Sequence, residues 1–346
     1  MAPTTHAVAR PRGLIVAGRG CLSKVYPESV RRSLAEIGDF SGEPVAREDL
    51  HSNLHRLRDI EVLCTSWGAP TLDEAMLAAA PQLRVVLHGA GSVRPVVTDA
   101  FWRRNLVISS AFLANSIPVA EYTVGAILLG NKRVFHHVRA IAARRSLTDG
   151  QPLDPLRFEC AGNFRSTVGL VAMGTIGRLV RDRLRAFDVR VITYDPFLPA
   201  AEASRLGVEL VSLPALFEQA DVVSVHAPLV SATEGMIRGA HFAALKPHAT
   251  FINTSRGAIV NEAEMVAALR TRPDLQAVLD VTWPEPPVPG SPLYELPNVF
   301  LTPHIAGSTG RECERLGEYV VEELRRYAHG KPLRWSIARA QAEAAT

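Results

Sequence analysis

The sequence contains few cysteines and no cysteine motif. Cys21, Cys64, Cys160 and Cys313 lie far apart, and no two of them form a Cys-x-x-Cys pair. This spacing provides neither a disulfide framework nor a set of metal ligands. We therefore expect free thiols, a cytoplasmic location and no bound metal.

Long apolar runs, a secretory signal and blocks of charge are also missing. No run reaches the roughly 18 apolar residues that a transmembrane helix needs, and the N-terminal stretch MAPTTHAVARPRG lacks the apolar core of a signal peptide. The formal net charge is only +3, and acidic and basic residues are interspersed. We expect neither nucleic acid nor membrane as a partner.

The sequence does contain enough apolar residues for two cores. Of its 346 residues, 47% are hydrophobic, and it shows no internal repeat. Short apolar stretches alternate with helical segments, which is typical of parallel α/β domains. Four strands are expected near residues 13, 61, 84 and 106, and up to seven more near 168, 190, 208, 221, 249, 275 and 298.

The stretch from Thr167 to Asp195 has the layout of a dinucleotide site. An apolar strand leads into a glycine turn, an amphipathic helix and a second strand that ends in an acid. Gly174 allows close approach to a pyrophosphate, Gly177 allows the helix to pack on the strand, and Asp195 can accept hydrogen bonds from a ribose. Ala172 replaces the first glycine of the usual pattern, so the turn must tolerate a methyl group.

Segments outside this stretch predict a glycine-rich turn, two helices and a loop. Gly89-Ala90-Gly91-Ser92 follows a predicted strand and can offer N–H groups to an anion, with a plain turn as the equal alternative. Pro118 is expected to open one helix, through residue 140, that bridges two domains and contributes to a dimer interface. A polar loop is expected at 146–164 and an amphipathic helix at 309–327.

Polar side chains recur at the predicted carboxyl ends of strands, where open α/β sheets bind ligands. Each of them alone is more often structural than functional, but several at one sheet edge favour a shared site. They are Asp195, His226, Arg256, Asp280 with Glu285, and His304.

Three of these side chains have complementary chemistry. Arg256 can bind a carboxylate through two hydrogen bonds, or it can form a structural salt bridge. His304 can move a proton near neutral pH, and a carboxylate beside it would hold its tautomer. Glu285, in the stiff run Trp283-Pro284-Glu285-Pro286-Pro287, is the candidate partner. Such a pair can protonate a carbonyl that is being reduced, or it can simply tie two loops together.

These motifs resemble the D-isomer-specific 2-hydroxyacid dehydrogenases over roughly residues 13–332. The matching motifs are the dinucleotide turn, Val225-His226-Ala227-Pro228-Leu229, Asn253-Thr254-Ser255-Arg256-Gly257, Leu279-Asp280-Val281 with Glu285-Pro286, and Thr302-Pro303-His304-Ile305-Ala306-Gly307. The resemblance implies two Rossmann-like parallel-sheet domains. One is a flavodoxin-like substrate domain of residues 1–117 and 306–346, and the other is an inserted NAD-binding Rossmann domain of residues 118–305.

The resemblance also implies roles for individual residues. Arg256, Glu285 and His304 would be catalytic. The amides of Ala90 and Gly91, with Arg256, would hold the substrate carboxylate. The implied cofactor is NAD, and the implied residues around it are Gly174, Thr175, Ile176, Gly177, Asp195, His226, Pro228, Thr233, Thr254, Asp280 and Gly307. The implied reaction interconverts a 2-oxo acid and its D-2-hydroxy acid in a cytoplasmic homodimer.

Two alternatives use the same fold: a phosphite or phosphonate dehydrogenase, and an NAD(H)-sensing scaffold similar to a corepressor. Glu285 argues against the formate type, which has glutamine there. Ser92-Val93-Arg94-Pro95 stands where many relatives carry an Asp-Asn pair. We expect no feedback control through a further domain after residue 346. Residues that could border a substrate with a second anionic or a flat group are Trp67, His88, Arg94 and Trp283.

Overall fold

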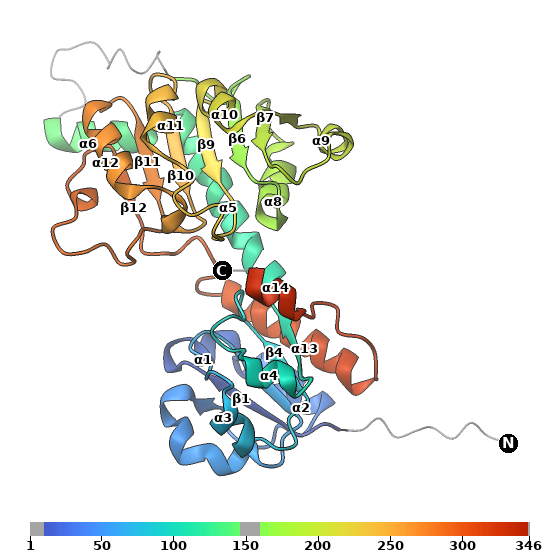
Figure 1. Cartoon of the computed structure of the whole chain (residues 1–346). Helices are drawn as coiled ribbons and strands as arrows, with labels where there is room; N and C mark the ends of the chain where they lie inside the picture. Colours follow the sequence, from blue (N-terminus) through green and yellow to red (C-terminus); the bar gives the residue numbers. More distant parts are fainter. Residues whose placement is uncertain (1–9, 146–159, 345–346) are drawn as a thin grey trace. The chain divides into compact units, whose positions relative to one another are not determined.

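In the computed structural model, the described residues are 10–145 and 160–344. They form two compact units, residues 1–115 with 308–346 and residues 116–307. Each unit is built on its own parallel sheet flanked by helices (Figure 1). The predicted α/β class with two parallel-sheet domains is therefore confirmed.

The first unit contains a five-stranded sheet with the order β2-β1-β3-β4-β5. This is the flavodoxin-like order, in which the chain reverses direction between the first and third strands. The sequence did not reveal β2, because two residues are too few to show a period. The strands are β1 (Gly13–Ala17), β2 (Val45–Ala46), β3 (Val62–Thr65), β4 (Val85–His88) and β5 (Val107–Ser110).

Helices cover both faces of this sheet. One face packs against α1 (Arg19–Val25), α2 (Glu28–Ile37) and α13 (Glu312–Ala328). The other face packs against the 3-10 helix η1 (Arg47–Leu57), α3 (Glu74–Ala79) and α4 (Asp99–Arg103). The chain returns to this unit with α13, whose Leu316, Val320 and Leu324 are buried. A short helix, α14 (Arg339–Ala344), follows.

The second unit contains a seven-stranded sheet with the order β12-β11-β10-β9-β6-β7-β8. The chain starts at β6, adds two strands on one side and then returns to place β9 on the other side of β6. Ligands bind outside the carboxyl ends of strands at such a switch point. The strands are β6 (Thr167–Val171), β7 (Arg190–Tyr194), β8 (Glu209–Leu210), β9 (Val222–Val225), β10 (Thr250–Asn253), β11 (Gln276–Leu279) and β12 (Val299–Leu301).

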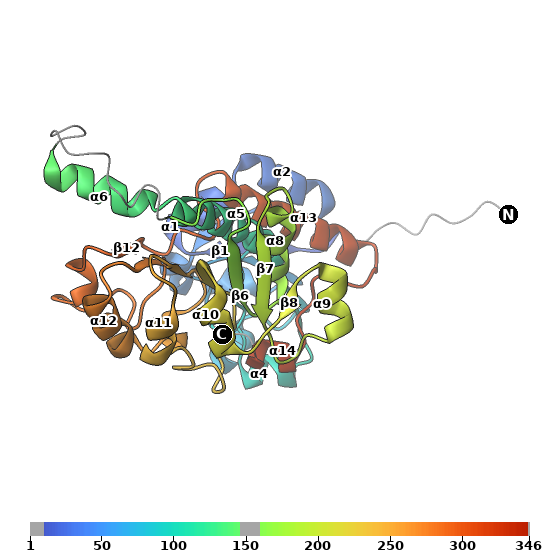
Figure 2. The ribbon, with the colours of Figure 1, turned by 90° about the horizontal axis from the view of Figure 1, so that it is seen from above.

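Alternate strand residues of this sheet enter two separate cores. One core includes side chains of α10 (Leu213–Gln219), α11 (Gly239–Ala244) and α12 (Glu262–Thr271). The other includes α5 (Phe112–Asn131), α8 (Thr175–Leu184) and α9 (Ala200–Leu206). Figure 2 shows α5 and α8 on one side of β6 and β7, and α10 and α11 on the other. The short 3-10 helices η2 (Gly257–Ile259) and η3 (Pro292–Tyr294) complete the unit.

The helix predicted to begin at Pro118 differs in the structure. The helix α5 begins at Phe112 and contains Pro118 in its interior, so the prediction of its start was wrong. It ends at Asn131, and Arg133 adopts a left-handed conformation (φ 54°) before α6 (Val134–Arg144) begins. The single predicted helix is therefore two helices. Most of the predicted 146–164 loop lies outside the described residues.

By length and hydropathy, α5 could also span a membrane. It has 20 residues, and 44% of its most apolar window is buried inside the protein. A core helix of an α/β domain satisfies the same criterion.

Candidate active site

The dinucleotide turn lies between β6 and α8, at the switch point of the second sheet. Ala172 has φ 76°, a left-handed conformation that normally favours glycine. A Cβ atom on Gly177 would lie 2.3 Å from the Ala172 carbonyl oxygen, so only glycine fits there. A Cβ on Gly174 would meet nothing within 4 Å. The turn is therefore tight on the inside and open at Gly174.

The N-terminus of α8 is the part of this turn that can bind an anion. Gly174 is its N-cap and Thr175 and Ile176 are its first residues, and no side chain among the described residues caps the helix. The first N–H groups and the positive end of the helix dipole are thus available to a phosphate. Together with the open space at Gly174, this arrangement fits the pyrophosphate of a dinucleotide.

Asp195 directly follows β7 and holds the turn in shape. Its carboxylate accepts one hydrogen bond from the Met173 N–H at 2.8 Å and another from the Phe197 N–H at 2.8 Å. The sequence predicted only a contact with a ribose. The structure shows that the same carboxylate also links the glycine turn to the loop after β7.

His226 directly follows β9 on the other side of the switch point. It is 8% exposed, and neither ring nitrogen has a hydrogen-bond partner in the part of the chain that the structure describes. Burial lowers the pKa of His226 from 6.5 to about 4, so its imidazole is neutral at physiological pH. In the loop that follows, the Thr233 hydroxyl donates to the Pro228 carbonyl at 2.5 Å and accepts from the Val230 N–H at 2.9 Å. A buried imidazole without a partner also fits a site that a ligand completes.

The loop that carries His304 follows β12 and is organised by Asp280. The Asp280 side chain is 2% exposed. Its carboxylate accepts hydrogen bonds from the Thr302 hydroxyl at 2.6 Å, the Ile305 N–H at 2.8 Å and the Ala306 N–H at 2.8 Å. His304 itself has φ 54° and donates its N–H to the Asp280 carbonyl at 3.1 Å. The resemblance implied only that Asp280 lies near the cofactor, and sequence reasoning missed this support of the His304 turn.

His304 and Glu285 are brought into direct contact. The Nδ1 atom of His304 lies 2.5 Å from Oε1 of Glu285, and both side chains are partly exposed. Because Nδ1 faces the carboxylate, Nε2 is the nitrogen that can meet a ligand. The arrangement can transfer one proton at Nε2 while Glu285 holds the ring.

Arg256 belongs to the same group of side chains. It follows β10, and its guanidinium donates to the Ser255 carbonyl at 2.8 Å. Burial lowers the pKa of Arg256 from its ordinary value, and the carboxylate of Glu285 acts in the opposite direction. A Cβ on Gly257 would lie 2.0 Å from the Thr282 backbone, so the Arg256 loop packs tightly on the loop that carries Glu285.

Two further predicted residues take supporting positions in the second unit. Thr254 is 8% exposed, and its hydroxyl lies 3.2 Å from that of Thr123 on α5. Gly307 is the last residue of the unit. Trp283, two residues before Glu285, is 63% exposed.

In the first unit, the glycine-rich loop after β4 turns its amide groups outward. The Ser66 hydroxyl donates to the Gly89 carbonyl at 2.7 Å, and the Ser110 hydroxyl lies 3.0 Å from the Ala90 carbonyl oxygen and 2.5 Å from that of Gly91. In a trans peptide the next N–H points away from the carbonyl.

The N–H groups of Ala90, Gly91 and Ser92 are therefore directed away from the two serines. Within the described part of the chain they donate no hydrogen bond. Consecutive free N–H groups of this kind form an anion site. Ser110 was not predicted, although its place at the carboxyl end of β5 could have drawn attention to it.

His88 has a structural setting. It is 3% exposed, and its Nδ1 atom lies 2.9 Å from the Thr65 hydroxyl. Burial lowers its pKa from 6.5 to about 4, against the effect of a backbone hydrogen bond with Ser92. His88 is thus a neutral support of the loop rather than a cation for a ligand.

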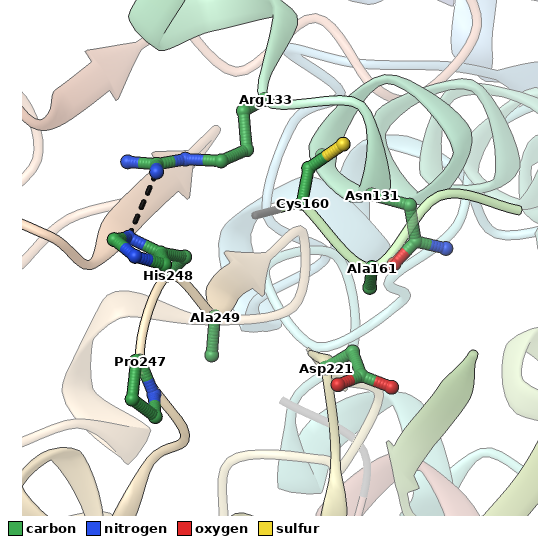
Figure 3. A pocket seen from close by; sticks show the side chains of 9 residues that line it. Asn131, Arg133, Cys160, Ala161, Asp221, Pro247, His248 and Ala249 are labelled. Carbon is green, nitrogen blue, oxygen red and sulfur yellow. Dashed lines mark hydrogen bonds between the residues drawn. The ribbon is translucent and has the colours of Figure 1, made fainter. Parts of the chain in front are cut away.

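A pocket of about 150 Å³ lies at the opposite, amino edge of the second sheet (Figure 3). The nitrogen Nη1 of Arg133 lies 2.8 Å from Nδ1 of His248 there. None of the predicted catalytic residues lines this pocket, so it is separate from the group around His304. Its lining includes Asn131, Arg133, Cys160, Asp221, His248 and Ala249.

Comparison with known proteins agrees with this arrangement. Residues 133–306 match the sequence model of the D-isomer specific 2-hydroxyacid dehydrogenase NAD-binding domain. The chain is 34% identical over 257 residues to an (S)-sulfolactate dehydrogenase of Chromohalobacter salexigens, covering 74% of this chain and 81% of that protein. It is 35% identical over 261 residues to the D-3-phosphoglycerate dehydrogenase of Mycobacterium leprae, covering 75% of this chain and 47% of that protein.

Solved structures show the same fold. A protein from Thermus thermophilus, 28% identical, superposes with a TM-score of 0.72 over 94% of this chain and 100% of that chain. A phosphoglycerate oxidoreductase from Rhizobium etli, 21% identical, has a TM-score of 0.76 over 96% of this chain and 99% of that chain, and it supports the fold alone.

The chain therefore belongs to the D-isomer specific 2-hydroxyacid dehydrogenase family, and its second unit contains the family's NAD-binding domain. It spans about half the length of the D-3-phosphoglycerate dehydrogenases that it matches.

Proposed function

We propose that this protein is an NAD-dependent oxidoreductase that interconverts a 2-oxo acid and its D-2-hydroxy acid. The contact of 2.5 Å between His304 Nδ1 and Glu285 Oε1, with Arg256 packed beside it, carries this proposal. A proton donor, a carboxylate that orients it and a cation for an anionic substrate are the groups that reduction of a 2-oxo acid requires.

Each of the three side chains has one role. His304 donates a proton from Nε2 to the carbonyl oxygen, and takes it back in the oxidative direction. Glu285 keeps the ring oriented and stabilises its protonated form. Arg256 binds the substrate carboxylate and polarises the carbonyl, because its guanidinium can form two parallel hydrogen bonds.

The remaining predicted residues bind the cofactor and the substrate carboxylate. Bound NADH supplies the hydride for C2 of the substrate. We assign the pyrophosphate to the uncapped N-terminus of α8 and the ribose to Asp195, whose charge disfavours the 2′-phosphate of NADPH. The outward N–H groups of Ala90 and Gly91 serve the substrate carboxylate.

A panel of 2-oxo acids with NADH and NADPH tests the proposal. Glyoxylate, hydroxypyruvate, pyruvate and phenylpyruvate form a suitable first set. We expect turnover of at least one of them with NADH, and a lower kcat/KM with NADPH. Replacing His304 by alanine is expected to lower kcat by about 10²- to 10⁴-fold. Full turnover by H304A would contradict the proton-donor assignment.

The alternatives give different results in the same assay. Tight NADH binding without turnover of any 2-oxo acid would support a scaffold, and turnover of phosphite would support a phosphite dehydrogenase. The relatives named above do not favour either alternative.

We further propose that the protein acts as a homodimer in the cytoplasm; the location is proposed because its four cysteines are scattered in the sequence without a Cys-x-x-Cys pair. Val138 and Ile141 of α6 are 60% and 42% exposed, and they lie one turn apart on the helix. Exposed apolar side chains at this spacing are typical of an interface. Light scattering at micromolar concentration should give twice the chain mass for the wild type and a lower mass for V138E. A monomeric wild type would contradict the proposal.

A further inference from the structure

The anion-binding loop of the first unit continues into a rigid turn that displays one cation. Val93 and Val96 are 4% and 2% exposed and hold the turn from inside. The Val96 N–H donates to the Val93 carbonyl at 2.9 Å, and the Leu72 N–H donates to the Val96 carbonyl at 2.8 Å. Arg94 lies between the two valines, is followed by Pro95 and is exposed. The backbone that carries Arg94 is thus fixed, while its side chain is accessible.

The positive charge of Arg94 is not paired with any of the described residues. Among the described residues, it forms no hydrogen bond and no ion pair. Arg19, which follows β1 at the same sheet edge, is instead paired with Asp49 at 2.8 Å. His88, which precedes the loop, is neutral because of its burial.

Arg94 also lies close to the free amides along the chain. Arg94 is only three positions after Gly91, so their Cα atoms are at most roughly 11 Å apart even if the backbone is fully extended. A guanidinium is always charged and can bind a carboxylate, sulfonate or phosphate through two hydrogen bonds. The loop therefore offers one anion site made of N–H groups and a second, separate cation.

We propose that Arg94 is a specificity-determining residue that binds a second anionic group of the substrate. The substrate class is then 2-oxo acids, and their D-2-hydroxy acids, that carry a carboxylate, sulfonate or phosphate beyond C2. The first carboxylate is bound by the Ala90–Ser92 amides, so this inference rests on the proposed function.

The test compares matched substrates that differ by one anionic group. Suitable pairs are hydroxypyruvate with 3-phosphohydroxypyruvate, pyruvate with 3-sulfopyruvate, and 2-oxobutyrate with oxaloacetate, each assayed with NADH. The wild type should prefer the doubly anionic member of at least one pair, and the preferred pair identifies the anion. Replacing Arg94 by glutamine should lower that preference by at least about tenfold, mainly through KM, with little effect on the singly anionic member. Replacement by lysine should restore part of it.

Arg84 provides the matched control. It is an exposed arginine that directly precedes β4, at the opposite end of the strand, and its Nε atom lies 3.6 Å from Glu61. R84Q removes the same charge from the same unit and should leave the preference unchanged. Equal loss in R84Q and R94Q, or no preference in the wild type, would overturn the inference.

A binding measurement separates this inference from the proposed function. 3-Phospho-D-glycerate should raise the Tm of the wild type more than D-glycerate does, and R94Q should lose this difference. If no 2-oxo acid is turned over, the proposed function fails, but a Tm difference that depends on Arg94 would still support the second anion site. The same comparison is made with the D-2-hydroxy acids of the other pairs, and equal Tm shifts in the wild type for the singly and the doubly anionic ligand of every pair would overturn it.

Discussion

Replacing Asp280 by asparagine tests whether a buried carboxylate positions the proton donor. In the wild type, both carboxylate oxygens accept hydrogen bonds from the segment that surrounds His304. An asparagine keeps the shape but offers one oxygen only. Its NH2 group must face a backbone N–H, so at least one donor, of Ile305 or Ala306, is left without an acceptor.

The size of the effect follows from the number of bonds. A hydrogen bond to a charged acceptor contributes about 1.5–3 kcal/mol, and an unsatisfied buried donor costs about 1–3 kcal/mol more. We expect D280N to lower the free energy of unfolding of the second unit by about 2.5–6 kcal/mol. A displacement of His304 by about 1 Å would lower kcat by up to about 10²-fold.

Asp274 supplies a matched control for this experiment. Its carboxylate accepts a hydrogen bond from the His248 N–H at 3.1 Å and pairs with Arg272 at 2.8 Å. D274N should therefore also lower stability, but it should leave kcat unchanged. Urea unfolding, hydrogen exchange of the Ile305 and Ala306 amides, and NADH-coupled turnover would be measured for both variants. Equal kcat values for D280N and D274N would refute the positioning role of Asp280.

Three other variants or conditions give separate expectations. G177A should have a free energy of unfolding lower by about 1–3 kcal/mol and should not bind NADH, because its methyl group would overlap the backbone at Ala172. G174A should fold normally and bind NADH more weakly. A stable G177A that binds NADH would contradict this. His88 and His226 have pKa values of about 4 when folded and near 6.5 when unfolded, so protonation favours the unfolded chain. The stabilisation that comes from keeping these histidines neutral is complete above pH 6.5, and about 3 kcal/mol of it is lost for each histidine as the pH falls toward 4. A variant with glutamine at both positions should show a smaller dependence of the free energy of unfolding on pH. An unchanged dependence would contradict this expectation. E285Q should lower kcat by about tenfold or more with an unchanged Kd for NADH, since it removes the charge that holds the imidazolium, and wild-type kcat would exclude that role.

Much of the fold could be predicted because parallel strands leave a strong pattern. Short apolar runs that end in glycine or polar residues mark the strands, and their carboxyl ends meet at one edge of a sheet. For this reason the sequence alone predicts that three residues far apart along the chain lie close together: Arg256, Glu285 and His304. The role of each residue stays a prediction until activity is measured.

Other features depend on tertiary contacts that no local pattern reveals. Pro118 lies inside α5, although proline usually marks a helix start, because apolar residues both before it (Ala114) and after it (Ala120) are buried in hydrophobic cores. The break at Arg133 lies three residues after Gly130, but a glycine inside a helical pattern does not by itself mark a helix end. The two residues of β2 form a strand only because β1 pairs with them.

The supporting role of Asp280 in the second unit and that of Ser110 in the first were missed for one common reason. Asp280 accepts N–H groups from the turn that carries His304, and Ser110 approaches carbonyl groups of the loop that carries Gly91. In each unit, a buried polar side chain forms hydrogen bonds with some of the backbone groups of a turn. The groups of that turn that can meet a ligand then point away from this side chain. A sequence motif contains the residues whose groups can meet a ligand. Asp280 and Ser110 each follow or end a strand other than the one that leads into the turn they support, so their supporting roles become visible only when the strands are paired in the sheet. Substituting either residue should displace the ligand-facing groups of the turn without removing them.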